Sequence, residues 1–203
     1  MRSAVSYYLV RGEIRNNTAK GEYYGGGGVM LRGSSITMLG GKVNENSADK
    51  SGGGGGAIYL LNGSMFKIAG GEINGNGSMS SGGAIHAYSD NRIIMTGGKI
   101  SNNTTKASGG GVYIYGGSFE MSGGEIKENT ANDGGGVFIL DSGKFLMKDG
   151  EISQNKANTN GGGVNVYNST FQMFGGSIIN NVANDGGGVY VTGSSAFTMF
   201  GGE

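Results

Sequence analysis

The sequence predicts an all-β fold: a right-handed parallel β-helix (β-solenoid) with three strands per rung and about seven rungs of about 26 residues. Three observations carry this prediction. Glycine supplies 46 of the 203 residues while proline is absent, a unit of about 26 residues recurs along the whole chain, and apolar residues alternate at period two inside each unit.

One asparagine marks the equivalent position of each copy, and these asparagines follow one another at intervals of 26 to 30 residues. A nearly constant period is typical of a solenoid. The residues are Asn17, Asn46, Asn76, Asn103, Asn129, Asn155 and Asn181. We expect them to form a structural ladder at a corner of the coil, where Asn accepts a positive φ and passes side-chain hydrogen bonds from rung to rung.

Each copy contains three short apolar segments. In the copy that begins at Gly109, segment A is 112–114, segment B is 119–121 and segment C is 126–129. Segments A and B alternate at period two and are rich in β-branched and aromatic residues, which is strand patterning. Left-handed β-helices favour shorter rungs with three equal sides, so this longer and uneven repeat favours the right-handed form.

The glycine and proline contents agree with this fold. Glycine costs backbone entropy, so 46 glycines indicate sharp corners and close backbone approaches, as at Gly123–Gly124 and Gly175–Gly176, where we expect positive φ. Proline would remove an N–H that an inner strand needs. We expect residues 1–203 to form a single β-helix domain that is part of a longer repeat array.

Composition excludes several function classes. The 15 acidic and 15 basic residues balance, so we expect no nucleic-acid partner. The absence of cysteine excludes a thiolate zinc site, and the apolar runs are too short to insert this segment into a membrane. We assign no catalytic residue, no metal site and no cofactor.

The outward columns of segment A are unusually aromatic. A stripe of this kind on a soluble rod marks a contact surface for a glycan or a protein. The predicted binding face consists of Tyr59, His86, Tyr88, Tyr113, Tyr115, Phe138, Tyr167 and Tyr190. Two alternatives remain open at this point: the aromatic residues only stabilise the sheet, or a loop covers them.

Segment A contains a histidine and a pair of aspartates of the types found in catalytic sites. His86 has no carboxylate at either adjacent column position, so it lacks the partner that a general base needs. Asp90 and Asp141 lie near the ends of segment A, two rungs or about 10 Å apart, which is the outer edge of the spacing in inverting glycosidases. We therefore expect no enzymatic activity.

The motif GGAI at Gly55–Ile58 and Gly82–Ile85, together with IKEN at Ile126–Asn129, resembles the repeats of chlamydial polymorphic outer-membrane proteins. The whole unit is similar to glycine-rich, adhesin-type repeats of bacterial surface proteins with a pectin-lyase-like fold. This resemblance implies a structural or adhesive β-helix module, extracellular or on the cell surface. The alternatives are a carbohydrate-binding or degenerate polysaccharide-lyase-like β-helix, and a segment of a phage or filament fibre.

Neither end of the repeat array has a polar cap, so we expect unpaired backbone groups on the end rungs. Another copy of the chain could cover them, with its residues 7–17 supplying the next rung. The expected partners are therefore other copies of the chain through their end rungs, and a glycan or a host or cell-surface protein on the aromatic stripe.

Overall fold

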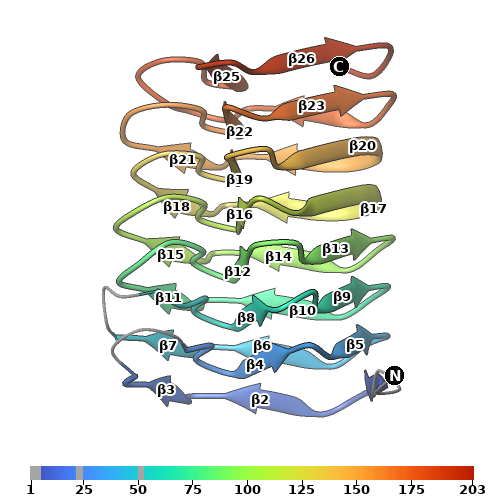
Figure 1. The fold of residues 1–203 in the computed structure, drawn as a ribbon, viewed down its shortest axis with the longest axis vertical. Helices are drawn as coiled ribbons and strands as arrows, with labels where there is room; N and C mark the ends of the chain where they lie inside the picture. Colours follow the sequence, from blue (N-terminus) through green and yellow to red (C-terminus); the bar gives the residue numbers. More distant parts are fainter. Residues whose placement is uncertain (1–5, 22–24, 50–52) are drawn as a thin grey trace.

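The computed structural model describes residues 6–21, 25–49 and 53–203. The chain coils into a rod of stacked rungs, and every strand pair in it is parallel (Figure 1). The strands of the described residues form three sheets that run along the rod axis. This is the parallel β-solenoid that the sequence predicts.

Segment A forms one sheet, in which each strand pairs with the equivalent strands of the neighbouring rungs. Its seven strands are β4 (Val29–Arg32), β8 (Ile58–Leu61), β12 (Ile85–Tyr88), β16 (Val112–Tyr115), β19 (Val137–Leu140), β22 (Val164–Tyr167) and β25 (Val189–Thr192).

Segments B and C together form a 13-stranded sheet. Segment B supplies β1 (Ser6–Leu9), β5 (Ser35–Met38), β9 (Met65–Ile68), β13 (Arg92–Met95), β23 (Thr170–Met173) and β26 (Ala196–Met199). Segment C supplies β2 (Glu13–Arg15), β6 (Lys42–Asn44), β10 (Glu72–Asn74), β14 (Lys99–Ser101) and β24 (Ser177–Ile179). In two rungs the segments merge into one strand each, β17 (Ser118–Lys127) and β20 (Lys144–Ser153), whose pairing shifts register at Ser122.

The third sheet consists of two-residue strands that the sequence analysis did not single out, because their apolar content is too small to show a period. They directly follow the marker asparagines. The strands are β3 (Thr18–Ala19), β7 (Ser47–Ala48), β11 (Gly77–Ser78), β15 (Thr104–Thr105), β18 (Thr130–Ala131) and β21 (Lys156–Ala157).

The strand register places the apolar residues of each segment over their equivalents in the neighbouring rungs. Ile85 pairs with Ile58 and Val112, Phe145 pairs with Phe119 and Phe171, and the same holds along segment C. The phenylalanine rings stack at 4.6–4.8 Å between centroids, close to the strand spacing of about 4.8 Å. The apolar core is therefore one continuous column along the rod, repeated rung by rung.

The corners differ in one respect from the expectation. Positive φ does not fall on the marker asparagines but on the residue before each of them, for example Asn102 at 54° and Glu128 at 57°. The left-handed residue turns the chain, and the next residue can then point its amide inward.

Between segments B and C, Gly124 and Gly176 have the positive φ that the sequence predicts, at 92° and 84°, while Gly123 and Gly175 do not.

Candidate functional site

The seven marker asparagines form one continuous hydrogen-bonded ladder. The Nδ2 of Asn103 donates to Oδ1 of Asn129 at 2.9 Å, and the backbone N–H of Asn103 donates to the same oxygen at 3.0 Å. Each inner Nδ2 also donates to a carbonyl one rung below, as from Asn129 to Ile100 at 3.1 Å. Both polar ends of each inner side chain are thus satisfied inside the rod, as burial requires.

A second polar ladder lies at the corner between segments A and B, and the sequence analysis missed it. The Oδ1 of Asn91 accepts from the N–H of Ser64 at 2.8 Å, and Ser169 Oγ accepts from the N–H of Gly143 at 3.1 Å. The sequence pattern that could have predicted this ladder is a Ser or Asn two residues before the inward Phe or Ile of segment B. Its members are Ser64, Asn91, Ser169 and Ser195, each of which accepts from the rung before it.

Part of the predicted binding face is covered. Tyr59 is only 1% exposed and His86 only 5% exposed, so these two side chains cannot form an open contact surface. The loop that enters segment A covers His86. A Cβ on Gly82 would lie 2.8 Å from the Cβ of His86, so glycine allows this loop to lie directly on the column. The same contact recurs between Gly109 and Tyr113.

The environment of His86 is that of a neutral core side chain. Its Nδ1 lies 3.1 Å from the carbonyl oxygen of Ser81, and the rings of Tyr59 and Tyr113 flank it at 4.9 and 4.7 Å between centroids. Its Nε2 has no hydrogen-bond partner among the described residues. Burial lowers the pKa of His86 from 6.5 to about 4, although the backbone groups of Ser81 and Gly54 act in the opposite direction.

Four aromatic residues of the binding face use ring faces to stack on one another. Tyr88 stacks on Tyr115 at 4.9 Å and 12°, and Tyr113 stacks on Phe138 at 5.6 Å and 13°. Burial, with a smaller contribution from Asp141, raises the pKa of Tyr113 to about 12, so its phenol is neutral. Tyr190 is half-buried, as are Tyr113, Tyr115 and Phe138. Stacked rings present mainly their edges outward, so these four residues offer few ring faces to a ligand.

The ring of Tyr88 has a free face that lies beside a hollow. Tyr88 is 41% exposed, and the side of its ring away from Tyr115 lines a hollow of about 580 Å³. The hollow spans three rungs, because Arg32, Leu61 and Tyr88 stand in register in one column. Its lining consists of Arg32, Leu61, Asn62, Gly63, Tyr88, Ser89 and Asp90. Tyr167, also 41% exposed, belongs to the same column but does not line this hollow.

Two further hollows continue along the same corner. Asp90 also lines a hollow of about 400 Å³ with Arg92 and Lys144, and both cations line a third hollow of about 430 Å³. Glu120, at the third hollow, accepts from Lys148 at 2.7 Å and pairs with Arg92 at 3.3 Å. The bond from Lys148 holds the pKa of Glu120 below its usual value. Side chains of both charges therefore line the corner next to the column that contains Tyr88.

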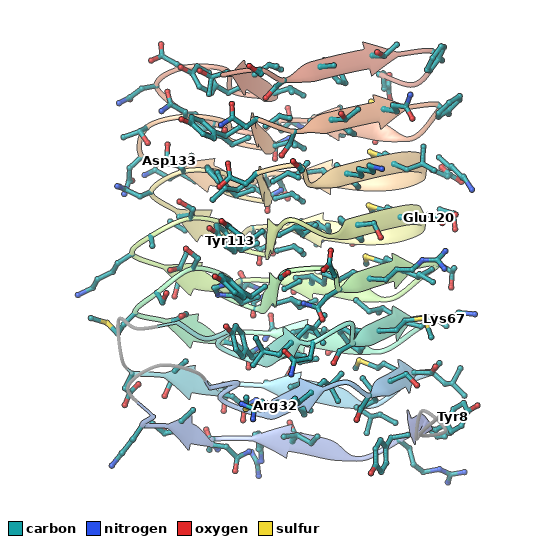
Figure 2. The ribbon with its side chains drawn as sticks, in the orientation of Figure 1. Tyr8, Arg32, Lys67, Tyr113, Glu120 and Asp133 are labelled. Atoms are coloured by element: carbon teal, nitrogen blue, oxygen red, sulfur yellow. The ribbon has the colours of Figure 1, made fainter. Side chains whose placement is uncertain are left out.

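Figure 2 labels six side chains along the rod. In Figure 2, Arg32 and Tyr113 lie near the middle of the rod, while Glu120 and Lys67 lie at one edge and Asp133 at the other. Within residues 6–21, 25–49 and 53–203, no three His, Asp or Glu side chains gather where they could hold a metal ion. Nor does any helix of that part have the length and apolarity to cross a membrane.

Comparison with known proteins identifies the family. A family model described as a right-handed β-helix region matches residues 3–200, nearly the whole chain. Searches of curated proteins and of solved structures found no significant match. The model match and the stacked parallel sheets agree on the same architecture, and the chain therefore belongs to the right-handed β-helix family.

Proposed function

We propose that this chain is a structural and adhesive module of a bacterial surface or secreted protein, without enzymatic activity, and that it works outside the cell. The observation that carries the proposal is the hollow beside Tyr88, an accessible aromatic ring face held on a rigid rod. An exposed ring beside polar groups is typical of a contact site for another molecule.

The rod itself supports the structural part of this role. Two internal ladders of polar side chains and a stacked apolar core tie each rung to the next, so the side chains of segment A keep a fixed spacing along the axis. A contact site on such a scaffold loses little conformational entropy when a partner binds.

The side chains weighed for catalysis support a non-enzymatic role. His86 is buried and has a lowered pKa, so this imidazole does not reach a substrate on the surface. Asp90 is exposed at the rim of the hollow, whereas Asp141 belongs to none of the three hollows of this corner. An acid–base pair for hydrolysis needs two groups that face one substrate.

The exposed strand edges support association between copies. Met199 at the end of β26 and Phe200 directly after it are exposed, and Tyr7 on β1 is exposed as well. If β1 of one copy pairs with β26 of another, Tyr7 continues the phenylalanine stack above Phe197, because Tyr7 already pairs with Ile36 of the same column. Light scattering over a concentration series tests this: a strict monomer at high concentration contradicts it.

Binding and turnover measured together test the main proposal. We expect the purified chain to bind bacterial or host cell surfaces, or a glycan array, without releasing any product. Tyr88→Ser should lower this binding, whereas Lys67→Ser, at another edge of the rod, should not. Product formation from a polysaccharide would overturn the non-enzymatic assignment and favour the carbohydrate-active alternative, for which the mixed-charge hollows beside Asp90 and Arg92 are the supporting observation.

A further inference from the structure

We propose that the hollow beside Tyr88 binds one aromatic ring, a tyrosine or tryptophan side chain of a partner protein, which inserts between Tyr88 and Arg32. This inference rests on the proposed adhesive function and names the partner chemistry of the same site. Leu61 stands between Tyr88 and Arg32 in the column, and its short side chain, 6% exposed, forms the floor.

The spacing of the column fits one ring. Strands of adjacent rungs lie about 4.8 Å apart, so Arg32 and Tyr88, two rungs apart, are separated by about 9.6 Å. Tyr88 and Tyr115 stack at 4.9 Å between centroids. A ring inserted at the level of Leu61 would therefore lie one stacking distance from Tyr88 and one from the Arg32 position. It would extend the existing stack by one member.

The two walls favour an aromatic ring. One wall is the free face of Tyr88, and the other is the exposed guanidinium of Arg32, a group that stacks on aromatic faces. A saturated sugar ring could stack on Tyr88 but gains no cation–π attraction from Arg32.

The rim selects the kind of aromatic side chain. Asp90 is an exposed carboxylate and Asn62 an exposed amide, and both line the hollow. A carboxylate accepts a hydrogen bond from a phenol O–H or an indole N–H, which phenylalanine cannot donate. We therefore expect tyrosine and tryptophan to bind better than phenylalanine.

The test is an NMR titration of the whole chain with N-acetyl-tryptophanamide and N-acetyl-tyrosinamide. N-acetyl-phenylalaninamide and methyl β-glucoside are the comparison probes. We expect shifts confined to residues around Leu61 and Tyr88, with the phenylalanine compound about threefold weaker. Equal or tighter binding of the glucoside would overturn the aromatic assignment and favour a glycan partner, and no shift with either aromatic donor would overturn the site.

Leu61→Tyr is the sharpest variant. The tyrosine ring at position 61 should fill the hollow between Tyr88 and Arg32 without changing the fold. Binding of the tryptophan compound should then fall at least about tenfold. Arg32→Ala should weaken binding about threefold or more, and Lys67→Ser should leave it unchanged. Unaltered binding to Leu61→Tyr, checked as folded by circular dichroism, would overturn the proposal. If that variant also binds cells as well as the wild type does, the adhesive function stands and only the ring site fails.

Discussion

The side-chain Nδ2 of Asn91 donates a hydrogen bond to the backbone carbonyl of Tyr88 at 2.8 Å. The same nitrogen donates to the carbonyls of Ser89 at 2.7 Å and Leu60 at 3.1 Å. One buried amide thus holds the left-handed turn that follows Tyr88, in which Ser89 and Asp90 both have positive φ. The corner ladder and the candidate site are therefore mechanically coupled.

Replacing Asn91 tests this coupling. Asn91→Ala removes the acceptor of the Ser64 N–H and a donor to three carbonyls, so we expect a loss of about 2 kcal/mol in the free energy of unfolding. Hydrogen exchange at the Ser64 amide should become faster. Asn91→Ser should keep that amide protected, because serine fills the equivalent place at Ser169. Equal exchange in both variants would contradict the coupling.

A buried asparagine inside the ladder should contribute more to the free energy of unfolding than the asparagine at its exposed end. Asn129→Ala removes the acceptor of Asn103 and the donor to Asn155, so we expect a loss of more than about 1 kcal/mol in denaturant unfolding. Asn17→Ala, the matched control at the exposed end, should cost less because water can replace its bonds. An unchanged midpoint for Asn129→Ala would show that the ladder does not stabilise the rod.

Two adjacent glycines should respond differently to alanine. A Cβ on Gly110 would lie 2.3 Å from the carbonyl oxygen of Gly135, whereas a Cβ on Gly111 would lie 2.7 Å from that of Gly136. Alanine already occupies the Gly111 position in two other rungs, at Ala57 and Ala84. We expect Gly110→Ala to cost about 2 kcal/mol more than Gly111→Ala in chemical denaturation. The reverse order of the two midpoints would contradict this packing.

Stability should fall in mild acid because of His86. Its pKa is lowered from 6.5 to about 4 in the folded chain, so between these values the unfolded chain binds more protons. This contribution is fully present above pH 6.5, is lost as pH falls and levels off near pH 4, with a total of roughly 3 kcal/mol. His86→Phe should reduce the difference between unfolding free energies at pH 7 and pH 4.5. An identical difference in both proteins would exclude His86 as its source.

Replacing a buried tyrosine should cost more stability than replacing an exposed one. Tyr59→Ser removes a ring that is only 1% exposed and leaves a cavity in its place. We therefore expect a loss of at least about 2 kcal/mol in the free energy of unfolding. Tyr167→Ser, at 41% exposure, should shift the thermal midpoint by little. A similar shift for both would mean that Tyr59 is not covered in solution.

The repeat determined the rod by itself. Because stacked rungs place equivalent residues over one another, the spacing of Asn103, Asn129 and Asn155 was enough to predict the fold and the positions of the asparagine ladder. The alternation within segment A also identified which side chains point outward. The sequence could not distinguish an outward side chain from an exposed one. His86 points outward, but the loop through Ser81 and Gly82 covers it. Only the tertiary structure decided that Tyr88 keeps a free ring face, because the hollow forms from three rungs at once: a long side chain at Arg32, a short one at Leu61 and a turn that Asn91 holds in place.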